Sequence, residues 1–254
     1  MSKGEIPIRK DAFELDLMRR AGKIVGEGLA LLRSRVRAGM TTLDLDAIFE
    51  KHVRDAGAVP TFKGYRGFPA SLCVSINEEI VHGIPSASRV LKDGDLLKLD
   101  AGATYKGYVG DSAVTVGVGG ISAKAKKLLD ATRESLMAGI AEVGPGRGIS
   151  RIGRAVQSYA EKLGYSVVED YVGHGIGKDL HEAPQVPNYV IPGFEFVLQS
   201  GHCVAIEPML NEGGKHTRRL GDDWTVVTRD GSLSAHFEHT VAVTKDGHEI
   251  LTLV

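Results

Sequence analysis

The spacing of apolar residues in the first part of the chain predicts two helices. Residues 11–37 are mostly helix-favouring, and their apolar positions recur at helical spacing up to a break at Gly39. Thr41 followed by Asp44 has the spacing of a capping box, in which two side chains accept backbone N–H groups at a helix start. We therefore expect a second helix from this box to about Ala56.

Short runs rich in β-branched residues follow and predict strands. The first three runs are residues 71–76, 95–102 and 108–118. A similar order then recurs, with helices expected over residues 122–143 and, with Ser150 as the cap, on to about Leu163. Further strands are expected at residues 165–172, 201–209, 224–228 and 237–244. This mixture of helices and strands indicates an α+β fold.

Two copies of the motif H-x-x-P, beginning at His82 and His181, show that the recurrence is finer than element order. In each copy a later glycine precedes, by six positions, an acid at the end of an apolar run, which is Asp100 in the first copy and Glu207 in the second. This agreement indicates an ancient duplication. We expect one catalytic domain of two similar halves, about residues 11–120 and 121–254, after an N-terminal arm, residues 1–10.

Composition and charge exclude several functional classes. The chain has 254 residues, is 43% hydrophobic and 25% charged, and carries a net charge of −1, so bulk charge indicates neither nucleic-acid nor membrane-surface binding. No apolar run approaches the roughly 18 residues that a membrane span requires. The first residues lack the apolar stretch of a secretory signal, and the two cysteines form no disulfide framework. We expect a cytoplasmic monomer that requires neither nucleic acid nor a membrane.

Each strand of a predicted hairpin, residues 96–118, carries an aspartate at a level that should be buried. If the chain turns at Tyr105 and Lys106, Asp100 lies directly opposite Asp111. Directly opposed residues have Cβ atoms about 4.5–5.5 Å apart, and two buried carboxylates at that distance repel each other. Either a shared proton or a cation between the carboxylates would relieve this repulsion.

Acidic residues in the second half of the chain favour the cation. Glu207 follows the apolar run CVAI, Glu238 opens the alternating strand EHTVAVT, and His174 lies in the glycine-flanked GHGIG. Four carboxylates and one imidazole carry too much negative charge for a single shared proton. They are sufficient to hold two divalent metals with bridging carboxylates. Oxygen-rich ligands with one histidine suit Mn, Fe, Co or Zn.

Five segments of the chain resemble the signature segments of type I methionine aminopeptidases. They are NEEIVHGIP, LDAGATYKGYVGDSA, YVGHGIGKDLHEAPQVPNY, AIEPML and FEHTVAVT. The resemblance extends from about Asp11 to the C-terminus. It implies the pita-bread fold, with two pseudo-symmetric α/β halves and an antiparallel sheet around a central dinuclear metal site. It also implies removal of the initiator methionine from nascent polypeptide N-termini, at the ribosome, when the second residue is small.

The same resemblance implies a role for each site residue. Its metal ligands are Asp100 at one metal, Asp111 and Glu238 between the two metals, and His174 and Glu207 at the other. Its catalytic residues are Glu207, which accepts a proton from the attacking water, His181, which hydrogen-bonds the developing oxyanion, and His82, which like His181 contacts the substrate. Its methionine pocket is formed by Tyr65, Phe68, Cys73 and Trp224, next to Leu180, where many relatives carry Phe.

Two other functions are compatible with parts of the sequence. A proline-directed peptidase of the same fold would usually carry a large additional N-terminal domain, whereas the segment before His82 is used by the first half. A non-catalytic paralogue would have lost metal ligands, whereas this chain keeps all five. Cys73 as a nucleophile is disfavoured because nothing around it indicates a lowered thiol pKa, and we expect a small buried side chain there.

Overall fold

The computed structural model describes residues 6–253, so residues 1–5 of the predicted N-terminal arm lie outside the described residues. The helices within the described residues are α1 Ala12–Arg35, α2 Thr42–Asp55, the 3₁₀ turn Tyr65–Gly67, α3 Ala123–Ile140 and α4 Ser150–Lys162. The four α-helices predicted from the apolar pattern are confirmed, with ends that shift by a few residues.

The strands are β1 Val59–Pro60, β2 Leu72–Ile76, β3 Glu79–Val81, β4 Leu96–Tyr105, β5 Tyr108–Gly117, β6 Ser166–Val167, β7 Gly173–Gly175, β8 Glu182–Val186, β9 Cys203–Ile206, β10 Met209–Asn211, β11 Thr217–Arg219, β12 Val226–Thr228, β13 Ser234–His236, β14 Glu238–Val243 and β15 His248–Ile250. The main sheet runs β1-β4-β5-β14-β9-β7-β8, with β2 paired to β4 and β15 paired to β14. Its pairs are antiparallel, so strands of both predicted halves join in one antiparallel sheet.

Of the two helix caps that the sequence predicts, at Thr41 and at Ser150, only the first is present. The Asp11 carboxylate accepts the N–H of Glu14, and the Thr41–Asp44 capping box is present. Ser150 is not a cap, because the chain enters α4 in helical conformation at Ile149. The Ser150 hydroxyl instead donates to Glu195 Oε2 at 2.6 Å.

The β4–β5 hairpin corrects the predicted register. The two-residue turn is Lys106-Gly107, and both residues have positive φ, 47° and 84°, as a type I′ turn requires. Asp100 therefore lies opposite Ala113, and Asp111 lies opposite Gly102. The pairing moves by two positions, so the two aspartates are diagonal neighbours that still point to the same face of the sheet.

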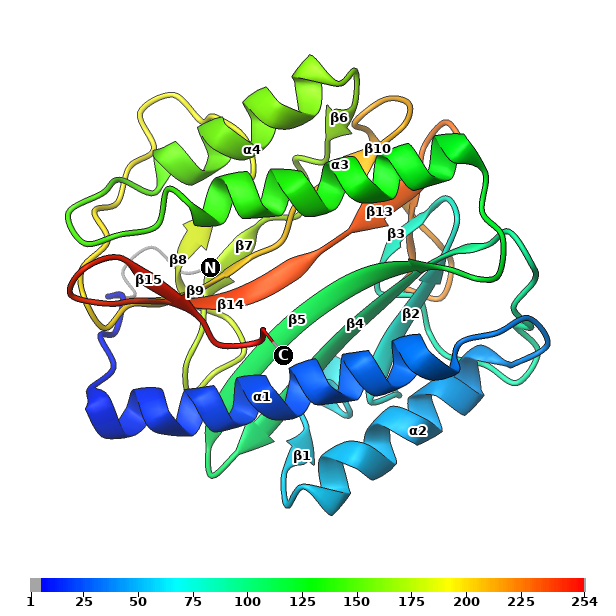
Figure 1. The fold of residues 1–254 in the computed structure, drawn as a ribbon, viewed down its shortest axis with the longest axis horizontal. Coiled ribbons are helices and arrows are strands. Elements are labelled where there is room, and N and C mark those ends of the chain that lie inside the picture. The colour runs from blue at the N-terminus through cyan, green and yellow to red at the C-terminus, as the bar shows by residue number, and fades with distance from the viewer. Residues whose placement is uncertain (1–5, 254) are drawn as a thin grey trace.

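The helices cover one face of the sheet and leave the acids on the other. Figure 1 shows α1 and α2 beside β4 and β5, and α3 and α4 over the region of β14, β9 and β7. Leu99 of β4 packs in the core with α1 and α2, so its neighbour Asp100 points to the opposite face. Val241 of β14 packs against α3 and α4, which places Glu238 on the same face as Asp100.

Candidate active site

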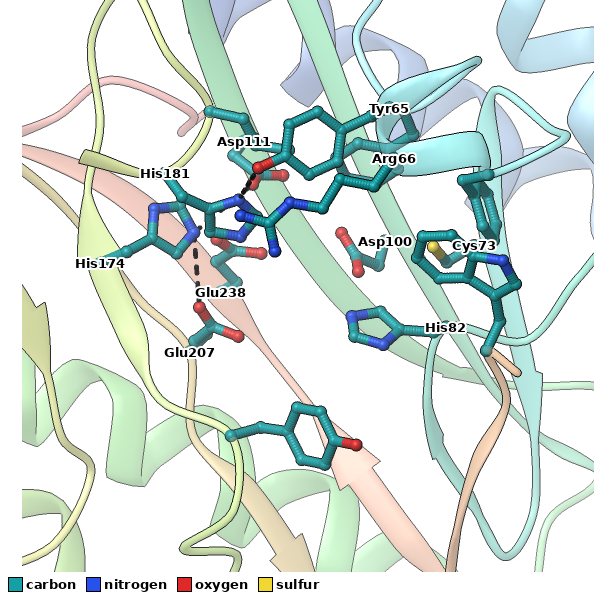
Figure 2. A pocket seen from close by; sticks show the side chains of 15 residues that line it. Tyr65, Arg66, Cys73, His82, Asp100, Asp111, His174, His181, Glu207 and Glu238 are labelled. Atoms are coloured by element: carbon teal, nitrogen blue, oxygen red, sulfur yellow. Dashed lines mark hydrogen bonds and ion pairs between the residues drawn. The ribbon is translucent and has the colours of Figure 1, made fainter. Parts of the chain in front are cut away.

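A cavity of about 280 Å³ opens on the face of the sheet that the helices do not cover. All the residues that the sequence analysis assigned to the site line it: Asp100, Asp111, His174, Glu207, Glu238, His82, His181, Tyr65, Phe68, Cys73 and Trp224. Leu180 lines it as well, together with Phe62, Arg66 and Tyr171, which the sequence analysis did not name. Figure 2 shows these side chains around the cavity.

Sheet pairing brings three of the acids together from three neighbouring strands. Asp100 of β4 and Glu238 of β14 both pair with Ala113 of β5, from its two sides. Asp111 lies two positions before Ala113 on β5, so its side chain points to the same face. Because neighbouring strands are only about 4.8 Å apart, the three carboxylates share one small patch.

The strands β7 and β9 bring the remaining two residues to this patch. His174 of β7 pairs with Ala205 of β9, and Glu207 directly follows β9. His174 Nε2 lies 3.5 Å from Glu207 Oε1 and 3.9 Å from Asp111 Oδ2. One ligand atom each of Asp111, His174 and Glu238 lies within 4.8 Å of the other two. This spacing allows the three side chains to bind one metal ion together.

His174 presents the nitrogen that a metal would need. Its Nδ1 lies 2.9 Å from the carbonyl oxygen of Gly175. Because a carbonyl only accepts, we assign the ring proton to Nδ1, which leaves the Nε2 lone pair facing the acids. Burial lowers the pKa of His174 to about 3, so the ring is neutral at neutral pH. A neutral imidazole oriented by a backbone carbonyl is the usual metal-ligating form.

The carboxylates lack the partners that buried charges require. Burial raises the pKa of Asp100 to about 7. Burial, and then repulsion from neighbouring carboxylates, raises the pKa values of Asp111, Glu207 and Glu238 well above their ordinary values. Asp100 Oδ1, Asp111 Oδ1 and Glu238 Oε1 are buried without a hydrogen-bond partner among the described residues. A divalent cation would pair with these atoms, and oxygen ligands with one imidazole fit such an ion.

His82 and His181 flank the acids without joining the group of close ligand atoms. His181 Nδ1 lies 2.6 Å from the Tyr65 hydroxyl, and the His181 ring centroid lies 4.3 Å from that of His174. Figure 2 shows His82 on the other side of the acids, where its ring centroid lies 6.2 Å from that of Trp224. Burial lowers the pKa values of both histidines to about 4, so both are neutral at neutral pH.

The end of the cavity beside Asp100 is apolar. Phe68 and Trp224 meet edge to face, with ring centroids 5.0 Å apart. Cys73 of β2 pairs with Asp100 of β4 and is buried. Burial, and then the charge of Asp100, raises the pKa of the Cys73 thiol well above its ordinary value. The thiol is therefore protonated at neutral pH, and the expectation of a small buried side chain is confirmed.

Arg66 is the site residue whose position was hardest to anticipate from the sequence. It lies in the 3₁₀ turn with a positive φ of 49°, between Gly64 and Gly67, which also have positive φ. Its guanidinium carbon lies 5.2 Å from the centroid of the Tyr65 ring. The paired glycines of GYRG signal a turn, but they do not indicate that the turn borders a cavity.

Comparisons with known proteins agree with this geometry. Residues 16–245 match the profile of Metallopeptidase family M24. The chain is 51% identical to methionine aminopeptidase 1 of Bacillus subtilis over 97% of this chain and 99% of that protein. It is 50% identical to the methionine aminopeptidase of Clostridium acetobutylicum over 97% of this chain and 98% of that protein.

Solved structures show the same relationship. The methionine aminopeptidase of Thermotoga maritima superposes with a TM-score of 0.96 at 42% identity, over 98% of this chain and all of that chain. The prolidase of Pyrococcus horikoshii shares the fold alone, with a TM-score of 0.78 at 22% identity over 97% of this chain and 63% of that chain. The predicted α+β pita-bread fold is confirmed, and the chain belongs to metallopeptidase family M24, with the type I methionine aminopeptidases.

Proposed function

We propose that this chain is a metal-dependent aminopeptidase that removes N-terminal methionine from nascent proteins and peptides. The observation that carries this proposal is the cavity itself, where four carboxylates and a neutral imidazole lie beside an apolar pocket. The names of the relatives at about 50% identity support the same activity.

The metal ligands that we propose are five. Asp100, Asp111, His174, Glu207 and Glu238, which all line the cavity, would hold the ions. The family and the buried donor set support the use of divalent metal, and we propose two ions drawn from Co, Mn, Fe or Zn. When bound, such ions make water a nucleophile near neutral pH and polarise the peptide carbonyl.

We propose that Glu207 accepts the proton of the attacking water. Its side chain is only 15% exposed and lies beside two neutral imidazoles, with Oε1 at 3.5 Å from His174 Nε2 and Oε2 at 4.0 Å from His236 Nε2. Glu207 is itself one of the proposed ligands, and a carboxylate within reach of the attacking water can accept its proton.

We propose that His181 donates a hydrogen bond to the oxyanion that develops on the substrate carbonyl. Burial raises the pKa of the Tyr65 hydroxyl, so it stays protonated and donates to His181 Nδ1 at 2.6 Å. We therefore assign the ring proton of His181 to Nε2, which can donate into the cavity. His82, neutral as well, contacts the substrate peptide from the other side.

The methionine side chain would occupy the pocket of Tyr65, Phe68, Cys73 and Trp224. Its walls are apolar and partly polarisable, which suits an unbranched thioether. Leu180 borders the same cavity and is buried. The pocket would select by shape, and one methylene more or less is worth only about 1–3 kcal/mol.

A peptide panel tests this specificity. The peptides Met-X-Ser should lose Met when X is Gly or Ala and resist cleavage when X is Trp. Norleucine should be accepted in place of Met, Leu should be released about 10–200-fold more slowly, and Lys and acetyl-Met peptides should hardly react. Faster release of Lys than of Met, or equal rates for Gly and Trp at the second position, would contradict the assignment. Ala-Pro peptides serve as the control for a proline-directed activity.

We also propose that the protein is a cytoplasmic monomer that meets nascent chains at the ribosome. Among residues 6–253, no helix combines the length and apolar character needed to cross a bilayer. The net charge of −1 gives no general attraction to nucleic acid. Sedimentation of the purified protein alone measures its oligomeric state. Sedimentation with ribosomes that carry a Met-Ala nascent chain measures whether it binds them.

A further inference from the structure

Lys10 of the N-terminal arm is buried beneath the loop that carries His181. Its Nζ lies 2.5 Å from Glu182 Oε2, and the two side chains are only 3% and 9% exposed. Glu182 follows His181 directly and opens β8. The two charges are far apart in sequence, so the ion pair ties the start of the chain to the catalytic loop, residues 177–182.

Glu182 holds this loop with its second oxygen. Oε1 accepts the backbone N–H of Lys178 at 2.8 Å and that of Asp179 at 3.3 Å. The loop is also wrapped closely around the ion pair, since a Cβ at Gly177 would lie 2.3 Å from Lys10 Cε. One carboxylate therefore fixes the backbone on the N-terminal side of His181, and Lys10 fixes that carboxylate.

The arm holds Lys10 in place independently of the loop. The Lys10 backbone N–H donates to the carbonyl oxygen of Gly201 at 2.7 Å, next to the start of β9. Its Nζ also donates to the carbonyl oxygen of Ile8 at 3.0 Å. The ammonium is thus held by backbone that is anchored to the main sheet, and it provides a fixed point for Glu182.

We propose that Lys10 is a positioning residue for catalysis, which sets the place of His181 through Glu182. The proposal rests on the role of His181 in the proposed function. Without the ammonium, Glu182 is an uncompensated buried charge, so its carboxylate moves towards water. This movement releases the amides of Lys178 and Asp179 and loosens the loop. A displacement of about 1 Å at a catalytic group can lower the rate about 100-fold.

The test compares Lys10→Met with Arg9→Met, a control in the same arm. Arg9 Nε donates to the Ser200 carbonyl oxygen at 2.7 Å and does not touch Glu182. Lys10→Met should lower kcat for Met-Ala-Ser about 10–100-fold, with KM and metal content unchanged, whereas Arg9→Met should match the wild type. In a His181→Ala background, Lys10→Met should lower kcat no further, because its effect passes through His181.

Hydrogen exchange of the peptide spanning residues 176–183 provides a readout that needs no turnover. Exchange should accelerate in Lys10→Met and not in Arg9→Met. Should Lys10→Met fail to fold, Glu182→Ala removes both the partner of Lys10 and the oxygen that accepts the two amides, and the same results are expected. An equal fall in kcat in the His181→Ala background, or unchanged exchange in the loop, would overturn the proposal. If exchange accelerates in Lys10→Met as expected but the wild type releases no methionine, the proposed function is contradicted and the link from Lys10 to the loop is not.

Discussion

Replacing Asp111 with Asn should lower the affinity for divalent metal more than 100-fold and stop methionine release. Asp111 is one of the three residues whose ligand atoms lie close together, with Oδ2 at 3.9 Å from His174 Nε2 and with Glu238 as the third member. The substitution keeps the shape of the side chain but removes the negative charge and one acceptor oxygen. Groups that only orient metal ligands already contribute about 10–100-fold to affinity, so the loss of a residue that would itself hold the metal should cost more.

Calorimetric titration with Mn²⁺ and turnover of Met-Ala-Ser measure the two effects. Asp16→Asn is the matched control, because it removes one negative charge from a side chain that is 80% exposed and does not line the cavity. It should bind metal and turn over as the wild type does. Wild-type metal affinity in Asp111→Asn would mean that this carboxylate is not a ligand.

Replacing His181 with Ala should lower kcat about 10²–10³-fold, the usual cost of a lost oxyanion donor, and leave metal binding unchanged. The ring is neutral, and the Tyr65 hydroxyl at 2.6 Å orients it. It lies outside the group of close ligand atoms formed by Asp111, His174 and Glu238. His82→Ala should likewise keep its metal and lose turnover.

Metal content measured on the same His181→Ala sample separates the two kinds of residue. Loss of metal from His181→Ala or His82→Ala would show that this histidine binds the metal and is not only a substrate contact. A full complement of metal with wild-type kcat would show that the histidine does not contact the reacting carbonyl.

The sequence was sufficient to predict the face of the hairpin but not its register. The predicted turn was placed one residue too early, since a turn at Lys106-Gly107 depends on a positive φ at a lysine, a conformation that sequence rarely signals. The prediction that Asp100 and Asp111 lie on one face of the sheet is nevertheless correct. Side chains alternate with a period of two, and the pairing moved by two positions.

The parts of the site that the sequence could not predict come from short or irregular segments. β7 has three residues, two of them glycine, and no alternating pattern, yet it carries His174. The predicted strand over residues 165–172 is formed only at Ser166–Val167. Arg66 and Tyr171 reach the cavity from segments whose place depends on tertiary packing. The individual residue roles are predictions that these experiments address, and the division into halves remains a prediction.

A crystal of the protein soaked in Mn²⁺, with anomalous scattering recorded, tests the central claim most directly. The account predicts one or two Mn²⁺ ions in the cavity, with oxygen or nitrogen atoms of Asp100, Asp111, His174, Glu207 and Glu238 about 2.0–2.4 Å away. Mn²⁺ bound elsewhere, or any of the five side chains turned away from the ions at full occupancy, would contradict it.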